Sequence, residues 1–372
     1  MVDLVIDSPA VGFGTKVNSA TQRGTVVITG GAGYIGSLLV RRLLARSYRV
    51  RVVDGLLFGD AALAEARHHP NFELVVADFR QMAAIGPAFA GADAVIHLGG
   101  LVGDPACALD SALTLSINQD ATATVAMACA AHGVKRLIFA SSCSVYGASD
   151  GLLDEASALN PVSLYAQTKI ASEQMLLDPA RSWPAPVIMR FATVYGFSPR
   201  PRFDLVVNLL TAKAVVDGRI TIQGGEQWRP FVHAEDLGKA LEQTLEAPLD
   251  LVAGQIFNVG SDAQNYRLAQ LGEVIQAAVP SASIETEAGS DRRDYRVSFA
   301  KIQDRLGFCP DWSLEAGIAQ IKAVLASGVI DDYRDDRYNN YLFLRALLAT
   351  NSSPLTPRDV QHRREAIETT AA

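Results

Sequence analysis

The stretch TVVITGGAGYIG, residues 25–36, decides the fold class of this protein. An apolar, β-branched run ends at Thr29, and glycines follow at positions 30, 33 and 36. Glycines at this spacing let backbone N–H groups approach a dinucleotide diphosphate closely, and the helix that follows presents the positive end of its dipole. The pattern therefore predicts a strand, a phosphate-binding turn and a helix N-terminus.

The rest of the chain alternates short β-branched runs with longer segments of helical periodicity, a pattern typical of parallel strands joined by crossover helices. We expect strands at residues 25–29, 49–53, 72–76, 94–98, 137–140 and 186–190, and helices at 35–45, 82–89, 111–131 and 163–177. This order predicts an α/β fold with a doubly wound parallel (Rossmann) sheet. Its ligand crevice should lie beyond the carboxyl ends of the strands.

After residue 190 the pattern loosens, and we expect a smaller C-terminal substrate-binding lobe. Helices are expected at 203–216, 232–245, 268–279 and 314–325, and a strand at 255–259. The expected domains are an N-terminal extension (1–24), the dinucleotide-binding domain (25–190, with 230–262 returning to it), the lobe (191–229 and 263–350) and a polar tail (351–372). The loop at 197–203 and the region 331–341 are expected to help select the substrate.

The composition excludes several classes of partner. The chain of 372 residues has 33 Lys and Arg against 40 Asp and Glu, a net charge of −7, which argues against binding to nucleic acid or an anionic membrane. Four cysteines lie without metal-ligand spacing, so we expect no metal site and no disulfide framework. With no apolar run of membrane-spanning length and no signal peptide pattern, a cytoplasmic protein is expected.

Acidic residues follow the second and third expected strands. Asp54 ends the second strand, where a carboxylate can accept hydrogen bonds from the adenosine ribose and would repel a 2′-phosphate. We therefore expect NAD rather than NADP, although Asp54 could instead start a surface turn. Asp78 could contact the adenine or cap a helix.

The segment Tyr165-Ala-Gln-Thr-Lys169 places a phenol and an ammonium group one helical turn apart. A free tyrosine has a pKa near 10, and the lysine, together with a bound nicotinamide cation, would lower that pKa and make the phenol a usable general base. Ser142 follows the strand at 137–140, so its hydroxyl could hold the reacting oxygen against Tyr165. The alternatives are a solvent-facing helix pair and a serine that only closes a turn.

Together these residues resemble the extended branch of the short-chain dehydrogenase/reductases, the NAD-dependent nucleotide-sugar epimerase/dehydratase group, over residues 25 to about 325. By that resemblance Ser142, Tyr165 and Lys169 match the catalytic positions, and residues 97–100 would line the nicotinamide side. The residues expected at the cofactor are Gly30, Gly33, Tyr34, Ile35, Gly36, Asp54, Asp78, Phe79, Leu98, Gly99, Asn118, Tyr165 and Lys169. Those expected at a nucleotide-sugar substrate are Ser142, Asn208, Arg229, Arg292 and Arg293. The resemblance also implies a homodimer through the helices at 111–131 and 163–177.

One departure bears on the reaction. Members that dehydrate sugars carry an Asp-Glu pair after the hydroxyl residue, whereas this chain has Cys143 and Ser144. We therefore expect a nucleotide-sugar epimerase acting at sugar C4, with a 4-ketoreductase that consumes NAD(P)H as the alternative. Further hypotheses are a variant dehydratase that uses Cys143 as acid or base, although Cys143 could simply be a small packed residue, and a non-catalytic dinucleotide sensor.

Overall fold

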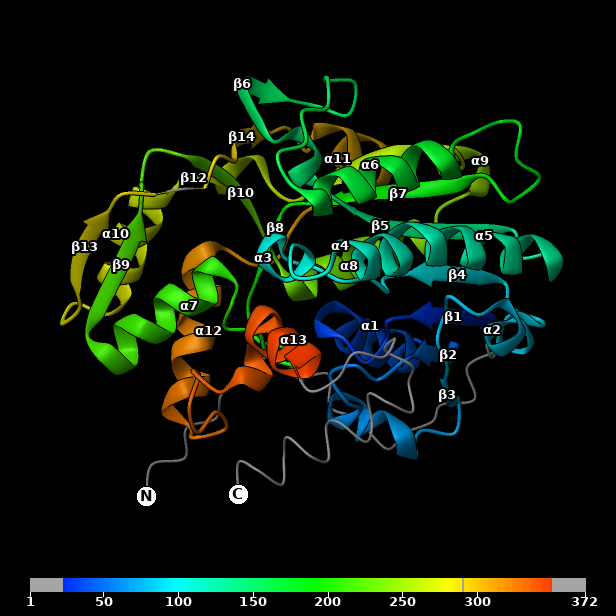
Figure 1. Cartoon of the computed structure of the whole chain (residues 1–372), viewed down its shortest axis with the longest axis horizontal. Coiled ribbons are helices and arrows are strands. Elements are labelled where there is room, and N and C mark those ends of the chain that lie inside the picture. Colours follow the sequence, from blue (N-terminus) through cyan, green and yellow to red (C-terminus); the bar gives the residue numbers. More distant parts are fainter. Residues whose placement is uncertain (1–22, 290, 350–372) are drawn as a thin grey trace.

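The computed structural model describes residues 23–289 and 291–349 (Figure 1). Most of the expected N-terminal extension and the whole of the expected polar tail lie outside these ranges. The described chain forms a central sheet flanked by helices, with a smaller lobe of helices and short strands beside it, at the left of Figure 1.

Seven parallel strands form the central sheet in the spatial order β11-β7-β5-β4-β1-β2-β3. Their bounds are β1 Thr25–Thr29, β2 Arg49–Asp54, β3 Phe72–Val76, β4 Ala94–His97, β5 Arg136–Ser142, β7 Pro186–Phe191 and β11 Ile256–Val259. The order reverses at β1, which pairs with both β2 and β4, so a ligand crevice is expected beyond the ends of β1 and β4. The doubly wound α/β sheet is confirmed.

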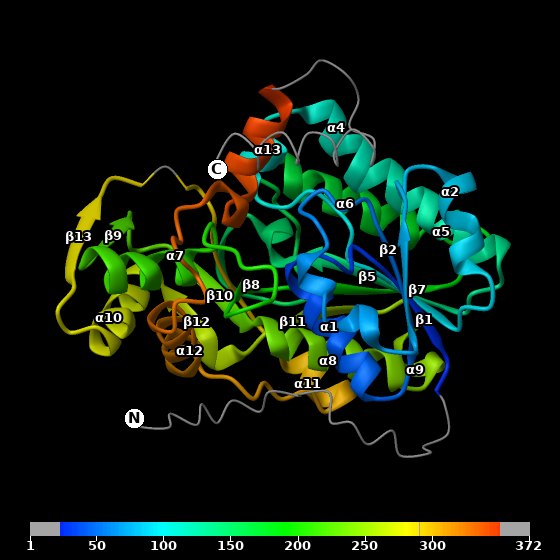
Figure 2. The same cartoon turned by 90° about the horizontal axis from the view of Figure 1, so that it is seen from below.

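Helices cover both faces of this sheet (Figure 2). On one face α1 and α8 contribute leucines such as Leu39 and Leu237 to an apolar core; on the other, α2, α5 and α6 contribute Phe89, Val125 and Leu176 to a second core. The bounds are α1 Tyr34–Ala45, α2 Met82–Phe89, α5 Ala121–Ala131, α6 Leu164–Leu176 and α8 Ala234–Glu246. The helices therefore bury one apolar stripe each and hold the strand ends in fixed positions.

The helix expected at residues 111–131 is interrupted. It consists of α4 Ser111–Leu115, a π-helical turn Ser116–Asp120 and α5. The wider turn carries Asn118, whose side chain is buried and bonds to the loop after β4. Apolar periodicity did not reveal this turn, because one additional residue in a helical turn changes the side-chain spacing only slightly.

The smaller lobe has an apolar cluster of its own, which includes Val207, Leu271 and Ile318. Its helices are α7 Val206–Ala212, continued by a π-helical turn Lys213–Asp217, α10 Leu268–Ala278 and α12 Leu314–Ala326. Its strands β9 Arg219–Gln223 and β13 Ser283–Glu287 pair with each other. The domain bounds expected from the sequence stay a proposal.

Other short elements connect the two parts. Strand β10 Trp228–His233 pairs with β8 Thr193–Tyr195 and β12 Asn265–Arg267, and β14 Asp294–Val297 pairs with β6 Ala148–Leu153. The remaining α-helices of the described ranges are α3 Asp104–Cys107, α9 Leu249–Val252, α11 Ala300–Leu306 and α13 Asn340–Ala349. The helix expected at 232–245 was wrong at its start, since residues 232 and 233 end β10 and α8 begins at Ala234. Within the described ranges, no helix has both the length and the apolar character that crossing a membrane requires.

Candidate active site

A cavity of about 320 Å³ opens at the carboxyl ends of the central strands. It is lined by the glycine turn after β1, by the loops after β2, β3, β4 and β5, and by α6 and the loop after β8. Arg293, Tyr295 and Asn340 add to it from the C-terminal part of the chain. The cavity therefore gathers segments from both the sheet and the smaller lobe.

The glycine turn leaves no room for a side chain at Gly30 or Gly36. A Cβ on Gly36 would lie 2.3 Å from the carbonyl oxygen of Gly30, and a Cβ on Gly30, where φ is +75°, would lie 2.7 Å from the Cα of Gly99. Helix α1 begins after Gly33 without any side-chain cap, so its first N–H groups are not satisfied by a capping side chain. This uncapped helix end beside a cavity fits a dinucleotide diphosphate.

Asp54 and Asp78 both reach the cavity. The Asp54 carboxylate accepts hydrogen bonds from the backbone N–H groups of Ala32 (3.0 Å) and Leu56 (2.8 Å), while burial raises its pKa. It therefore ties the glycine turn to the loop after β2. The Asp78 carboxylate is bound by the Arg80 guanidinium, and α2 is preceded by Gln81, so Asp78 does not cap that helix.

Tyr165 and Lys169 lie in α6 and both line the cavity. Ser163 caps the N-terminus of α6: its hydroxyl accepts from the N–H of Ala166 (3.2 Å) and donates to Asp104 (2.8 Å). The Nζ of Lys169 lies 5.7 Å from the centroid of the Tyr165 ring. The helix therefore presents both side chains to the crevice above the glycine turn, as the spacing predicted.

The pKa of Tyr165 is raised in this structure, whereas the sequence led us to expect a lowered one. Burial raises the pKa of the Tyr165 phenol, although a hydrogen bond with Ser142 and the positive charge of Arg202 act in the opposite direction. Burial also lowers the pKa of Lys169 to about 8. The side chains of the protein by themselves thus keep Tyr165 neutral near pH 7, and a lowered pKa of this phenol requires a further positive charge in the cavity.

Ser142, the last residue of β5, and the two residues after it have different surroundings. The Ser142 hydroxyl lines the cavity and accepts from the N–H of Ser144 at 3.1 Å. Cys143 is fully buried, its Sγ donates to the carbonyl oxygen of Arg190 at 3.3 Å, and burial raises the pKa of its thiol. Because Cys143 is not part of the cavity lining, the structure argues against the catalytic thiol considered from the sequence. Ser144 also lines the cavity, but its Oγ is buried and has no hydrogen-bond partner among the described residues.

Two residues expected near the cofactor lie behind the cavity wall. The His97 ring is buried between the hydroxyls of Thr29 (2.6 Å) and Thr122 (3.1 Å), and burial lowers its pKa to about 3. Asn118 exchanges two hydrogen bonds with the backbone of Leu101 at 2.8 and 2.9 Å. Neither side chain lines the cavity, whereas Phe79, Leu98 and Gly99 do. Asn118 therefore positions the loop after β4 instead of touching a ligand there.

Of the residues expected at the substrate, Ser142 and Arg293 line the cavity, whereas the other three do not. Asn208 does not line the cavity, because its amide bonds to the backbone of Gly196 and Arg202 and holds the loop after β8. Arg292 is exposed, with its Nη2 3.5 Å from the carbonyl oxygen of Val162. Of the three arginines expected at a phosphate, only Arg293 lines the cavity.

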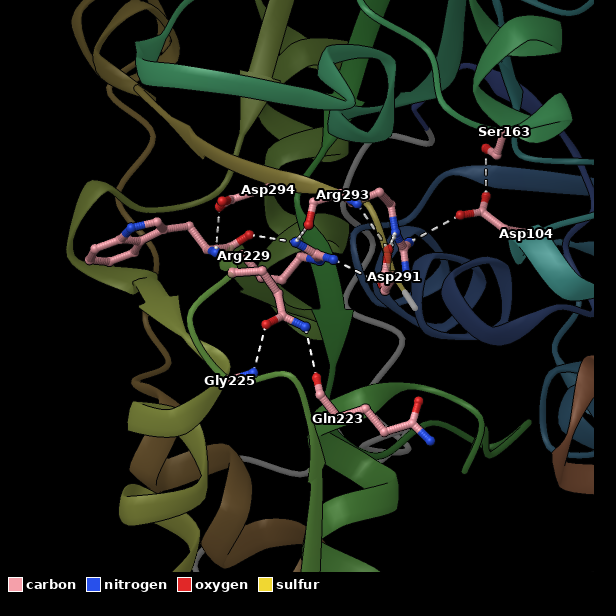
Figure 3. A network of polar contacts seen from close by, with 10 residues as sticks. Asp104, Ser163, Gln223, Gly225, Arg229, Asp291, Arg293 and Asp294 are labelled. Atoms are coloured by element: carbon pink, nitrogen blue, oxygen red, sulfur yellow. Dashed lines mark hydrogen bonds and ion pairs between the residues drawn. The ribbon is translucent and has the colours of Figure 1, made fainter. Parts of the chain in front are cut away.

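Figure 3 shows how the protein itself neutralises two of these arginines. Arg229 donates to the carbonyl oxygens of Trp228 and Arg293 and pairs with Asp291 at 2.9 Å. Arg293 pairs with the same Asp291 carboxylate at 2.5 Å and with Asp104 at 3.4 Å. The guanidinium of Arg229 is thus engaged inside the protein and does not line the cavity; its expected role as a phosphate contact stays a prediction.

Two arginines that the sequence reasoning did not assign do line the cavity. Arg200 and Arg202 come from the loop after β8, within the segment 197–203 that was expected to affect substrate choice. The chain's own signal for them is the repeated Pro-Arg pattern, Pro199-Arg200-Pro201-Arg202. The pattern alone does not show that these arginines line a cavity, because this depends on where the fold places the loop.

Residues 26–260 match the NAD dependent epimerase/dehydratase family. The chain belongs to this family. UDP-arabinose 4-epimerase 1 of Arabidopsis thaliana is 35% identical over 293 residues, 70% of this chain and 68% of the relative. A dTDP-glucose 4,6-dehydratase of Streptomyces griseus is 29% identical over 308 residues, 79% of this chain and 92% of the relative. Among solved structures, MoeE5 in complex with UDP-glucuronic acid and NAD is 27% identical with a TM-score of 0.71, covering 82% of this chain and all (100%) of that one.

Membership in the NAD dependent epimerase/dehydratase family confirms the expected resemblance, the enzymatic class and NAD as the cofactor of the family. The relatives include both epimerases and dehydratases, so their names alone do not choose the reaction of this chain. The homodimer and the cytoplasmic location stay predictions.

Proposed function

We propose that this protein is an NAD-dependent nucleotide-sugar 4-epimerase that acts by transient oxidation at sugar C4. The observation that carries the proposal is the arrangement of Tyr165, Lys169 and Ser142 around one cavity, directly beyond the glycine turn. The segment after Ser142 places no carboxylate in this cavity. Such a site suits removal and return of a hydroxyl proton and offers no acid-base pair for elimination.

The residues of the chain would divide the work as follows. Tyr165 takes the proton from the sugar hydroxyl and later returns it, and Ser142 shares a hydrogen bond with the same oxygen. Lys169, held by the carbonyl oxygen of Ala140, keeps a positive charge near the phenol. NAD, when bound on the glycine turn, would accept and return a hydride. Since the hydride returns to the sugar, no cofactor is consumed.

Dehydration at C4 to C6 is disfavoured by the neighbours of Ser142. Cys143 is buried behind the wall, and Ser144 offers only a neutral hydroxyl. The carboxylates that line the cavity already accept hydrogen bonds from the protein; they are Asp54, Asp78 and Asp104. None of these carboxylates directly follows Ser142, the position at which the dehydrating members carry their Asp-Glu pair.

The direct test is turnover without added cofactor. Purified protein should release NAD on denaturation and interconvert two C4-epimeric UDP- or dTDP-hexoses. Tyr165→Phe should lower kcat by about 100-fold or more, because the general base is lost. Tyr266→Phe, a phenol of the smaller lobe outside the cavity, is the matched control and should leave kcat unchanged. Steady consumption of NADH or NADPH with a 4-keto-6-deoxy sugar nucleotide would contradict the proposal and identify a 4-ketoreductase.

We also propose a homodimer through the surface formed by α4, α5 and α6. Two large apolar side chains on this surface, Leu115 and Met127, are 41% and 48% exposed. Exposed apolar side chains of this size suit a two-fold contact between identical helices. Light scattering should give twice the mass of the chain, and Met127→Glu should shift it to a monomer. A monomeric wild-type protein at micromolar concentration would exclude this dimer.

A further inference from the structure

Arg200 lines the cavity, and its guanidinium contacts an aromatic ring and an amide instead of a carboxylate. The side chain belongs to the loop between β8 and α7 and is 7% exposed. Its Cζ lies 3.9 Å from the centroid of the Phe58 ring, and its Nη2 donates to the Oδ1 of Asn340 at 2.7 Å. The positive charge is therefore held by an aromatic ring and a neutral amide.

The other arginines of the cavity have carboxylate partners. Arg202 forms two hydrogen bonds with Asp204, at 2.9 and 2.7 Å, and Arg293 pairs with Asp291. Within the described ranges, Arg200 has no ion pair, and its Nε and Nη1 donate to no protein acceptor. Among the described residues, Arg200 thus differs from Arg202 and Arg293 in having no carboxylate partner.

The electrostatic cost of this arrangement shows in the pKa of Arg200, which falls to about 9. Burial is the main cause, and the charge of Arg202 adds to it, although Asp204 and Tyr34 act in the opposite direction. A buried cation whose direct contacts are an aromatic ring and an amide loses more hydration than it regains. An anion in the cavity would recover that free energy.

Asn340 fixes the geometry of this site. It begins α13, its Nδ2 donates to the carbonyl oxygen of Val102 at 3.4 Å, and its backbone N–H donates to Asp204 at 3.3 Å. Its Oδ1 is therefore turned towards Arg200. Because the acceptor is an amide, the guanidinium is oriented by the protein while its charge stays available to a ligand.

We propose that Arg200, oriented by Asn340 and Phe58, is the site in this cavity that binds an anionic oxygen group of the ligand, a phosphate or a carboxylate. The inference rests on the proposed nucleotide-sugar and NAD site and adds the residue that recognises its charge. Three sources share this chemistry: the diphosphate of the dinucleotide, the diphosphate of the nucleotide sugar, and a carboxylate on the sugar itself. Arg229 and Arg292, which the sequence favoured, do not line the cavity.

The test measures binding and does not depend on turnover. Dissociation constants of wild-type protein and Arg200→Gln are measured by calorimetry for NAD, UDP, UDP-glucose and UDP-glucuronic acid. We expect Arg200→Gln to weaken at least one of them roughly 10-fold or more, because a charge-assisted hydrogen bond is lost. Arg219→Gln, which removes an exposed positive charge outside the cavity, should change every affinity by less than about twofold.

A second pair of variants keeps the arginine and changes only its partner. Asn340→Asp supplies Arg200 with a carboxylate of the protein and should weaken the same ligand as Arg200→Gln does. Asn340→Ser removes the amide without adding charge and should weaken that ligand much less. This pair carries the test if Arg200→Gln fails to fold, and thermal melting of each variant checks its folding.

The pattern of losses identifies the anion. Weaker binding of NAD alone assigns the cofactor diphosphate, equal loss for UDP and both UDP-sugars assigns the nucleotide diphosphate, and loss for UDP-glucuronic acid alone assigns the sugar carboxylate. Unchanged affinities for all four ligands, or equal effects of Asn340→Asp and Asn340→Ser, would overturn the inference. A protein that lacks epimerase activity but shows one of these losses would reject the proposed function and retain the anion site.

Discussion

The Nζ of Lys169 donates a hydrogen bond to the carbonyl oxygen of Ala140 at 2.7 Å. This bond joins α6, which carries Tyr165, to the carboxyl end of β5, where Ser142 is the last residue. The ammonium group also lies 4.8 Å from the centroid of the Phe139 ring. Lys169 therefore has two roles. Its hydrogen bond holds the candidate catalytic helix against β5, and its ammonium group places a positive charge in the cavity.

Removing Lys169 should change how stability depends on pH. Burial lowers its pKa to about 8 in the folded protein from 10.5, so between these values the unfolded chain binds more protons. The free energy of unfolding contributed by this group therefore rises as the pH rises from 8 to 10.5, by on the order of 2–3 kcal/mol. Denaturant unfolding of wild type and Lys169→Met from pH 7 to 10.5 should show this difference. Parallel curves for the two proteins would contradict it.

His97 should lower the stability of the folded protein at acidic pH. Its folded pKa is about 3 against 6.5 in the unfolded chain, so the unfolded state binds more protons between these values, and stability falls as the pH falls below 6.5. His97→Gln keeps a polar group between Thr29 and Thr122 without this titration. The variant should lose less stability than wild type between pH 6.5 and 4, measured by urea unfolding. Equal slopes would show that His97 is not buried as a neutral ring.

Gly36→Ala should disrupt the phosphate-binding turn. The added methyl group would lie 2.3 Å from the carbonyl oxygen of Gly30, and that backbone cannot move without opening the turn. We expect NAD affinity to fall by roughly 10-fold or more and the folded state to lose about 1–3 kcal/mol. Gly86→Ala in α2 is the control, since its Cβ would meet only His132 at 3.6 Å. Retained NAD affinity in Gly36→Ala would argue against diphosphate binding at this turn.

Cys143→Ala should leave the reaction intact. The thiol donates to the carbonyl oxygen of Arg190 and does not line the cavity, so its loss should cost about 1 kcal/mol of stability and change kcat by less than about threefold. Thiol titration of the native protein should show one fast-reacting group, because Cys309 is exposed and the other three cysteines are buried. A large loss of kcat in Cys143→Ala would restore the hypothesis of a catalytic thiol.

Much of the cofactor side could be predicted from the sequence, because its determinants are local. The glycine spacing at residues 30–36 acts within one turn, and the separation of Tyr165 from Lys169 puts them on one helical face wherever the helix lies. The strands of the central sheet were also predicted at their places, since a strand buried on both faces needs a continuous apolar run. The boundary at residues 232–234 was missed because β10 and α8 meet there without a turn signal.

The sequence by itself determined the phosphate turn and the Tyr165–Lys169 pair, since each depends on residues a few positions apart, and it indicated the doubly wound sheet through the alternation of apolar strands and amphipathic helices. Tertiary structure alone decided the charges that a ligand meets. Asp291 neutralises Arg229 across 62 positions of the chain, and Asn340 reaches Arg200 across 140, so neither partner can be found from local spacing. The physical reason is that a buried ion pair or its absence depends on which side chains the fold brings within a few ångströms of each other.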